Sequence, residues 1–265
     1  MSFRSALSRR ATALTLCGSV LAALLAVAAF APLPVSIVEP GLTADVLGAR
    51  DGTQVITVTG TPLRETSGQL RMVTIAATQP NASVHLSDVW HAWFAKDQAA
   101  MPRDSVYPSG GSVKDIEKAN QKEMTQSQDA ATTAALHHLG LAPSKVTVDL
   151  QLADVGGPSA GLLFTLGIID KVSGNGHGGD LTGGRTIAGT GTIDDKGKVG
   201  AVGGVPLKEQ AARRDGATVF IVPRGECTDA KAQLPHGLKL IPVDTLDGTL
   251  AALAALDAGK ATPAC

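Results

Sequence analysis

The spacing of apolar residues predicts strands and helices along most of the chain. Short runs that alternate or are rich in β-branched residues predict strands at residues 55–58, 70–76, 146–152, 187–193, 198–202, 218–222 and 238–241. Apolar residues three and four positions apart predict helices at residues 113–139, 162–174, 206–214 and 245–256. Because strands and helices alternate in the second half, the pattern predicts an α/β or α+β fold.

Two segments of the first half are less regular. Residues 60–68 contain Pro62 and have a glycine at each end, and they predict a hairpin loop between the first two strands. Residues 81–108 contain both tryptophans, Trp90 and Trp93, with Phe94 beside them. We expect a short helix there whose aromatic side chains pack on the core, in preference to a platform that binds a ligand.

Residues 11–38 form an uncharged, mostly apolar segment that is long enough to cross a bilayer as a helix. Three arginines precede it, which predicts that this end stays in the cytoplasm and that the rest of the chain lies outside. A cleaved signal peptide is the alternative, since residues 26–28 and 29–31 have the small-x-small form of a cleavage site. The length of the apolar run favours an uncleaved anchor.

The composition excludes several classes of protein. Apolar residues make up 44% of the 265 residues and charged residues 18%, so the chain is not disordered. There are 23 Lys and Arg against 24 Asp and Glu, and the net charge of −1 argues against a nucleic-acid partner. The three cysteines have no zinc-ligand spacing, and the sequence predicts no metal and no cofactor.

A serine on a sharp turn is the first candidate for chemistry. Residues 157–161 (GPSAG) place Ser159 between a predicted strand and a predicted helix, and Gly157 and Gly161 leave room for a substrate carbonyl. The N–H groups of Ser159 and Ala160, at the start of the helix, can hold an oxyanion. A plain helix N-cap is the alternative role for this serine.

The same pentapeptide fits the G-x-S-x-G nucleophile elbow of α/β-hydrolases, which needs an acid and a histidine downstream. His177 and His236 are available as the base, and Asp194, Asp195 or Asp215 as the acid. No HGGG-type oxyanion motif precedes the serine, and both histidines lie in predicted loops or turns. A Ser-His-Asp hydrolase of small esters is therefore an alternative function.

Lys208 is the second candidate for chemistry. It follows a glycine-rich stretch and lies in the first turn of a predicted helix, where the helix dipole and burial would lower its pKa. A lysine with a lowered pKa can act as a general base. A solvent-exposed helix lysine is the ordinary alternative, and the neighbouring Glu209 could also hold the amine protonated.

Together these stretches resemble the proteolytic domain of the Lon family, which uses a Ser-Lys dyad. The resemblance includes residues 124–140 as a long helix, 146–161 as the strand before the nucleophile, and 187–212 as the elements that deliver the lysine. It implies that Ser159 is the nucleophile and Lys208 the base, and that Thr190 hydrogen-bonds the lysine amine.

The chain also departs from parts of the family pattern. Its Val-Gly-Gly-Pro-Ser sequence looks like that of membrane-anchored bacterial proteases that pair a Lon domain with a PDZ domain, but only residues 141–144 lie where the PDZ module would be. No G-x-x-x-x-G-K-[ST] sequence for ATP occurs in the chain. Many Lon proteins have an acidic residue where this chain has Gly156, which leaves a catalytically silent Lon-like scaffold as a second alternative.

The expected organisation is a basic tip and membrane anchor at residues 1–38, a linker at 39–54, a Lon-type domain at 55–256 and a tail at 257–265. The expected function is that of a single-pass, ATP-independent serine endopeptidase outside the cytoplasm, which cleaves unfolded or exposed segments of proteins. A homo-oligomer of six copies is expected only by analogy with the family.

Cys227 and Cys265 are the two cysteines that follow the apolar segment. The predicted topology places both in an oxidising compartment, where disulfides persist. We therefore expect a disulfide bond between them, with a role in stability and none in catalysis.

Overall fold

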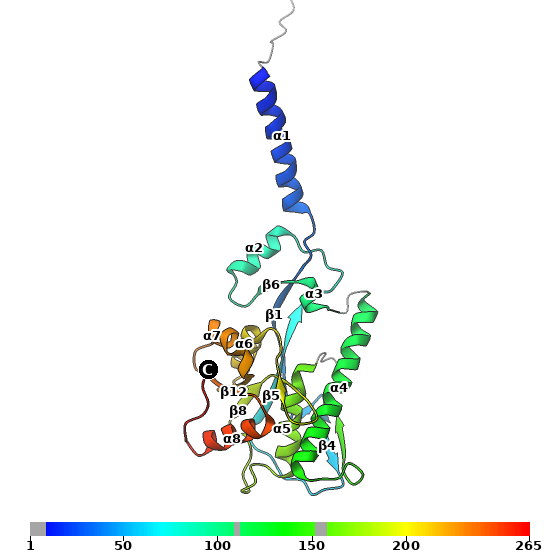
Figure 1. Cartoon of the computed structure of the whole chain (residues 1–265), viewed down its shortest axis with the longest axis vertical. Coiled ribbons are helices and arrows are strands. Elements are labelled where there is room, and N and C mark those ends of the chain that lie inside the picture. Colours follow the sequence, from blue (N-terminus) through cyan, green and yellow to red (C-terminus); the bar gives the residue numbers. More distant parts are fainter. Residues whose placement is uncertain (1–8, 109–111, 152–157) are drawn as a thin grey trace, which may run out of the picture. The chain divides into compact units, whose positions relative to one another are not determined.

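The computed structural model describes residues 9–108, 112–151 and 158–265 (Figure 1). The chain divides into two compact units, and each is described here by itself. The larger unit contains Glu39–Ala76 and Ser109–Cys265, and the smaller one contains Met1–Val38 and Ala77–Pro108. The chain enters the smaller unit twice, so the expected continuous domain at residues 55–256 is interrupted by residues 77–108.

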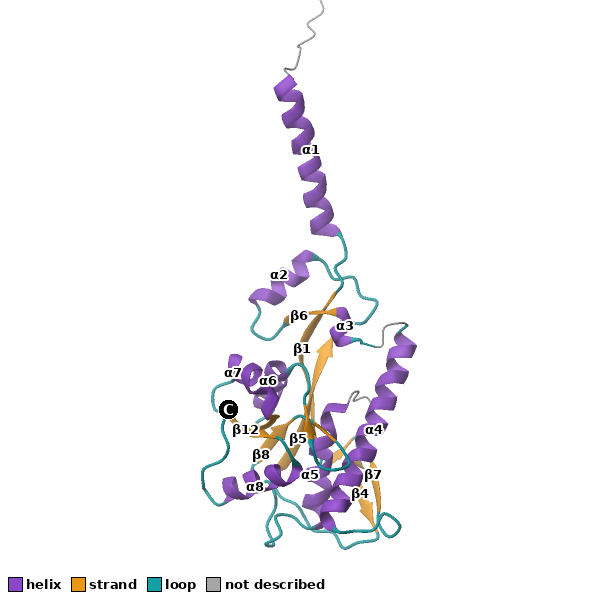
Figure 2. Cartoon of the chain, viewed as in Figure 1, coloured by secondary structure: helices purple, strands orange, loops and turns teal. Residues whose placement is uncertain are grey.

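A central sheet organises the larger unit (Figure 2). Its strands lie in the order β12 (Lys239–Val243), β11 (Val219–Pro223), β8 (Thr186–Gly189), β5 (Gln69–Ala77) and β1 (Val35–Asp45). Strands β5, β8, β11 and β12 pair in parallel. Parallel neighbours need a crossover connection, and α6 (Val205–Arg214) and α7 (Cys227–Ala232) lie in the connections on either side of β11.

The two faces of this sheet are covered by different helices, because successive side chains of a strand point to opposite faces. Val219 and Ile221 of β11 join a core cluster with α4 (Val113–Leu139), α5 (Gly161–Val172) and α8 (Leu246–Asp257). Phe220 and Val222 join a second cluster with α6 and α7. The larger unit is therefore a mixed α/β structure with helices on both faces of the sheet.

The four helices predicted from apolar spacing are confirmed to within two residues. Helix α4 begins after Ser112, whose side chain accepts a hydrogen bond from the Asp115 N–H, and it ends at Gly140 in the left-handed conformation. Helix α5 is buried over ten successive residues, including Phe164. It is the most deeply buried helix of the described part of the chain, and it starts next to Ser159.

The expected hairpin loop at residues 60–68 is wrong. Strand β4 (Ile56–Thr59) pairs antiparallel with β7 (Thr147–Leu150), whereas β5 pairs with β8. Gly60 marks a close approach of two backbones, since a Cβ there would lie 2.0 Å from the Lys145 carbonyl oxygen. The turn residues therefore predicted the wrong pairing of β4 with β5, because each of these strands pairs with a segment far along the chain.

The predicted strand at residues 187–193 divides into two. Its first part is β8 of the central sheet, and its second part is β9 (Thr192–Ile193), which pairs antiparallel with β10 (Val199–Gly200). Residues 194–197 form the turn between β9 and β10, where the Gly197 N–H donates a hydrogen bond to the Asp194 carbonyl oxygen at 3.0 Å. The division matters because Thr190 and Gly191 lie between the two strands and reach the serine loop.

The N-terminal helix and linker differ from the expected boundaries. Helix α1 (Arg9–Phe30) ends before Pro32 and Pro34, which lack the N–H that a helix needs. Residues 35–45 form β1, and β2 (Ala49–Arg50) pairs with β3 (Thr53–Gln54), so the expected linker at residues 39–54 is largely strand. Ala11–Phe30 is long and apolar enough to cross a membrane, with a mean hydropathy of 2.3 and none of it buried.

The smaller unit contains the start of β1, β6 (Ala99–Pro102), α2 (Leu86–Phe94) and α3 (Arg103–Val106). The expected short helix is present as α2, but its aromatic side chains do not pack on the core. Trp90 is 63% exposed, Trp93 80% and Phe94 67%. Ala92 is the buried residue of this helix, and it lies on the opposite side of the helix from Trp90.

Candidate active site

Ser159 lies in a single 3-10 turn, Pro158–Ala160, that leads directly into α5. Helix α4 supports this turn, since the Ser127 hydroxyl donates a hydrogen bond to the Pro158 carbonyl oxygen at 3.0 Å. Gly161 cannot be larger, because a Cβ there would lie 2.8 Å from the same Ser127 oxygen. Gly157 lies outside the described residues. The serine is thus held at the N-terminal end of a buried helix, as the sequence predicts.

Lys208 lies in the first turn of α6, after Gly204, which caps the helix with a φ of 70°. Its side chain is 4% exposed, and its Nζ donates a hydrogen bond to Thr190 Oγ1 at 3.1 Å. Burial removes water from the ammonium group and lowers the pKa of Lys208 to about 8, against the weaker opposing effect of the Glu226 carboxylate. A larger fraction of the amine is therefore neutral near physiological pH than for an ordinary lysine, and the neutral form is the one that a general base needs.

Thr190 connects the lysine with the serine loop. Its fully buried hydroxyl accepts the hydrogen bond from Lys208 and donates its own proton to the Ser159 carbonyl oxygen at 3.3 Å. The Gly191 N–H donates to the same carbonyl oxygen at 2.9 Å, and the Gly191 carbonyl accepts from the Leu162 N–H. Segments far apart in the sequence are thereby held together around the backbone of Ser159.

The hydroxyl of Ser159 makes no hydrogen bond with the Lys208 amine within the described ranges, and the contact between the two residues passes through Thr190. Catalytic hydrogen bonds are often long in the absence of substrate. Ser159 is partly buried, whereas Ala160 next to it is 2% exposed. The site thus combines a serine at a helix start with a buried lysine that is hydrogen-bonded to the same loop.

Glu209 is a buried residue of this region whose environment the sequence did not reveal. Its side chain is fully buried, and neither carboxylate oxygen has a hydrogen-bond partner in the part of the chain that the structure describes. Burial raises the pKa of Glu209 to about 8. The sequence suggested that Glu209 could hold Lys208 protonated, but the carboxylate that raises the pKa of Lys208 is that of Glu226.

The residues of the alternative Ser-His-Asp site are not brought together with the serine. His177 and His236 are both exposed, and neither imidazole hydrogen-bonds to Ser159 among the described residues. Asp194 and Asp195 are exposed in the turn between β9 and β10, and Asp215 accepts hydrogen bonds from Arg214. Within residues 9–108, 112–151 and 158–265, no three His, Cys, Asp or Glu side chains are grouped as metal ligands.

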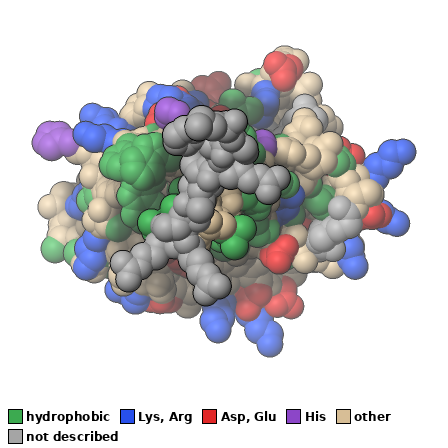
Figure 3. Space-filling model, turned by 90° about the horizontal axis from the view of Figure 1, so that it is seen from above, with side chains coloured by type: hydrophobic (Ala, Val, Ile, Leu, Met, Phe, Trp, Pro, Cys, Tyr) green, Lys and Arg blue, Asp and Glu red, His purple; other side chains and the backbone are tan. Residues whose placement is uncertain are grey.

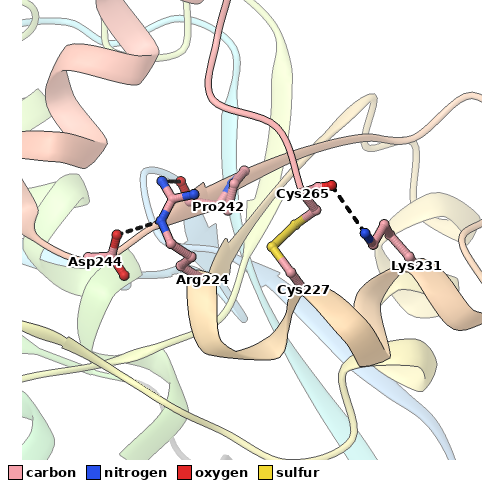
Figure 4. The surroundings of a disulfide bond; sticks show 6 residues. All are labelled: Arg224, Cys227, Lys231, Pro242, Asp244 and Cys265. Atoms are coloured by element: carbon pink, nitrogen blue, oxygen red, sulfur yellow. Dashed lines mark hydrogen bonds and ion pairs between the residues drawn. A yellow bond between two sulfur atoms is a disulfide. The ribbon is translucent and has the colours of Figure 1, made fainter.

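Cys227 and Cys265 are joined by a disulfide bond, with their Cα atoms 5.3 Å apart (Figure 4). The Lys231 amine donates a hydrogen bond to the Cys265 carbonyl oxygen at 3.2 Å. Cys265 also packs against the apolar cluster beneath α6 and α7. These contacts attach the C-terminal segment to the helix that follows β11.

Comparison with known proteins agrees with this geometry. A family model described as the Lon protease (S16) C-terminal proteolytic domain matches residues 116–255. A protein named Lon protease from Chloroflexus aggregans is 35% identical over 97 residues, which cover 35% of this chain and 11% of that protein. The chain thus matches only a small part of that relative's length. Over half of its own length, however, this chain belongs to the family of Lon protease C-terminal proteolytic domains.

Proposed function

We propose that this chain is a membrane-anchored serine endopeptidase that hydrolyses peptide bonds through a Ser159–Lys208 dyad without ATP. The observation that carries the proposal is the buried Lys208 amine, which has a pKa of about 8 and is hydrogen-bonded through Thr190 to the serine loop. A solvent-exposed lysine on a helix surface would be neither buried nor hydrogen-bonded to Thr190.

In the proposed reaction the Ser159 Oγ attacks the carbonyl carbon of a peptide bond while the neutral Lys208 amine takes the hydroxyl proton. Lys208 then gives this proton to the leaving amine, and a tetrahedral intermediate collapses to an ester on Ser159. Water hydrolyses the ester, with Lys208 again acting as the base. The N–H groups of Ser159 and Ala160 at the start of α5 would stabilise the oxyanion.

Thr190 acts in this scheme as a positioning residue. Because its only hydroxyl proton goes to the Ser159 carbonyl oxygen, its lone pair is directed to the Lys208 amine. This hydrogen bond holds the amine beside the serine loop, and it leaves the nitrogen lone pair of the neutral amine available to accept the proton of Ser159. It also couples the position of the lysine to the backbone of the nucleophile.

The proposed location follows from α1 and the charges before it. Ala11–Phe30 supports a single membrane anchor, and the three arginines that precede it support a catalytic domain outside the cytoplasm. A cleaved signal peptide would give the same compartment, and the N-terminal sequence of the mature protein distinguishes the two. The chain carries no phosphate-binding loop sequence, so the proposed substrates are unfolded proteins or exposed segments that need no ATP-driven unfolding.

The test is hydrolysis of a labelled unfolded protein by the full chain in detergent micelles, without ATP. Ser159→Ala and Lys208→Met are expected to abolish cleavage. Ser173→Ala, at the other end of α5, and Lys198→Met, at an exposed position, are the matched controls and should retain it. His177→Ala and His236→Ala should also retain activity.

Three results would contradict the proposal. Full activity of Lys208→Met would exclude the dyad, and loss of activity in either histidine variant would favour the Ser-His-Asp alternative. A folded wild-type chain without hydrolytic activity would favour a catalytically silent scaffold. A requirement for ATP in the purified chain would contradict ATP independence alone.

A further inference from the structure

Helix α2 presents an apolar stripe to its surroundings. Successive residues of a helix are 100° apart, so Leu86, Trp90, Trp93 and Phe94 fall within one narrow sector of its surface. These side chains are 46%, 63%, 80% and 67% exposed, and the Trp90 and Phe94 rings contact each other with centroids 5.0 Å apart. Exposed aromatic groups of this size in one patch mark a binding surface.

The other sides of α2 have different characters. Ala92 is buried, and Val89 on the same side is partly buried, so this side packs against the rest of the smaller unit. Ser87, Asp88 and His91 are exposed and lie on the third side. The helix therefore has two apolar sides. One packs on the protein, and the aromatic stripe is a second apolar surface that remains exposed.

The structure holds the start of α2 next to the end of α1. Ala29 and Phe30, the last residues of the candidate membrane span, line one groove with the start of α2, where His85, Leu86, Ser87 and Trp90 complete the lining. The Leu33 N–H, just beyond α1, donates a hydrogen bond to the Val84 carbonyl oxygen at 2.7 Å. Hydrophobic side chains form green patches on the face of the molecule that the space-filling view shows (Figure 3).

The connection to α2 is fixed from a second side by Arg103. Its Nη2 donates hydrogen bonds to the Ala82 carbonyl oxygen at 2.9 Å and to the Val35 carbonyl oxygen at 3.3 Å. Arg103 thus links the segment before α2 to the first residue of β1, which follows α1 in the chain. The aromatic stripe cannot move far from the end of the span without breaking these bonds.

From this geometry we propose that α2 is an interfacial helix whose aromatic stripe lies in the headgroup region of the bilayer that α1 spans. The inference rests on the proposed membrane anchoring. A span of 20 residues is about as long as the hydrocarbon core is thick, so its last turn lies at the membrane–water boundary. A groove shared with that turn lies at the same depth, and tryptophan is enriched there.

The occupant of the stripe is therefore lipid. Trp90 and Trp93 each join an apolar ring to an N–H group, which suits a region that is apolar on one side and wet on the other. Asp88 and His91 would face the headgroups and water, and Ser87 lies at the edge of the groove. Helix α2 would give the smaller unit a second attachment to the membrane surface and would limit its rotation about α1.

The two tryptophans of the chain both lie in this stripe, so intrinsic tryptophan fluorescence reports on α2 alone. The experiment uses the full chain in phosphatidylcholine–phosphatidylglycerol vesicles, with lipids brominated near the headgroup or near the bilayer centre. The expected result is strong quenching by the shallow bromines, several-fold weaker quenching by the deep ones, and protection from iodide in the aqueous phase.

Single-tryptophan variants make the test specific. Trp90→Phe and Trp93→Phe each leave one reporter on the stripe and should behave as the wild type does. Adding His91→Trp to the double variant Trp90→Phe/Trp93→Phe moves the only reporter to the polar side of the same helix. That variant should be quenched by iodide and much less by brominated lipid.

Flotation of the vesicles separates failure of this inference from failure of the anchor. A chain that does not float with lipid contradicts membrane anchoring and the interfacial helix with it. A chain that floats while its tryptophans are quenched by iodide and not by bromine overturns the interfacial helix alone. Protection from both quenchers in floating vesicles would also overturn it, because the stripe would then be covered by protein.

Discussion

The buried pair Lys208 and Glu209 should give the stability of this protein an unusual dependence on pH. The side chains are 4% and 0% exposed. The folded-state pKa of Lys208 is about 8 instead of 10.5, and that of Glu209 is about 8 instead of 4.5. Burial is the main cause in both cases, and it opposes charge on either group.

The sign of each contribution follows from which state binds the proton. Between pH 4.5 and about 8 the unfolded chain ionises Glu209 while the folded chain keeps it protonated, so stability falls as the pH rises. Between about pH 8 and 10.5 the unfolded chain keeps Lys208 protonated while the folded chain does not, so stability rises. These two groups together therefore produce a minimum near pH 8.

The size of each effect can be worked out at about 1.4 kcal/mol for each pH unit. The fall due to Glu209 amounts to at most about 5 kcal/mol, and the rise due to Lys208 to at most about 3.5 kcal/mol. The free energy of unfolding of Glu209→Gln should thus exceed that of the wild type near pH 8 and equal it near pH 4. Near neutral pH, Lys208→Met should be more stable than the wild type by about 2.5 kcal/mol, after the lost Thr190 hydrogen bond is counted at about 1 kcal/mol.

The assay is denaturant unfolding of the full chain in micelles at a series of pH values, with the disulfide intact. Far-ultraviolet circular dichroism is the signal, since tryptophan fluorescence reports only on α2. Glu123→Gln, an exposed glutamate of α4, is the matched control and should follow the wild type. Parallel pH profiles for the wild type and Glu209→Gln would refute the reasoning for the carboxyl group. A Lys208→Met protein less stable than the wild type near neutral pH would refute it for the lysine.

The remaining predictions concern activity and the disulfide bond. Peptide hydrolysis should rise with pH along one ionisation near pH 8, since only neutral Lys208 accepts the serine proton, and the pH dependence of kcat/KM measures this ionisation in the free protein. Lys208→Arg should be inactive at every pH, and a profile centred near the histidine pKa would contradict the dyad. Opening the Cys227–Cys265 bond, which joins residues 38 positions apart, should cost up to about 4 kcal/mol of stability while activity persists under native conditions. Thiol alkylation and mass mapping of the unreduced protein check the bond itself, and two free thiols would contradict it.

Local patterns in the sequence were sufficient for most of the secondary structure and for the identity of the candidate residues. The period of apolar residues gave residues 113–139 as a helix, and α4 has these bounds. A glycine-flanked serine before an apolar run predicted the start of α5, and the lysine after two glycines predicted the start of α6. Such features are visible because helix periods, caps and breakers act over a few residues.

The tertiary structure decided what depends on distant partners. The sequence placed Lys208 in the first turn of a helix. Its burial and its hydrogen bond to Thr190 depend on α6 lying close to the end of β8 and to the serine loop. Glu209 carries no local sign of burial, since a charged helix residue is usually exposed. Turn residues between β4 and β5 likewise could not reveal that each pairs elsewhere.

The aromatic residues of α2 show the same limit for the surface. The sequence predicted a short helix whose aromatic side chains pack on the core, and only the structure shows that these side chains are exposed. Ala92 is buried towards the protein, whereas Trp90 and Trp93 remain exposed, and Trp90 lines a groove with the end of α1. A sequence pattern specifies which side chains share a face, whereas the neighbour of that face is specified by contacts between segments far apart in the chain.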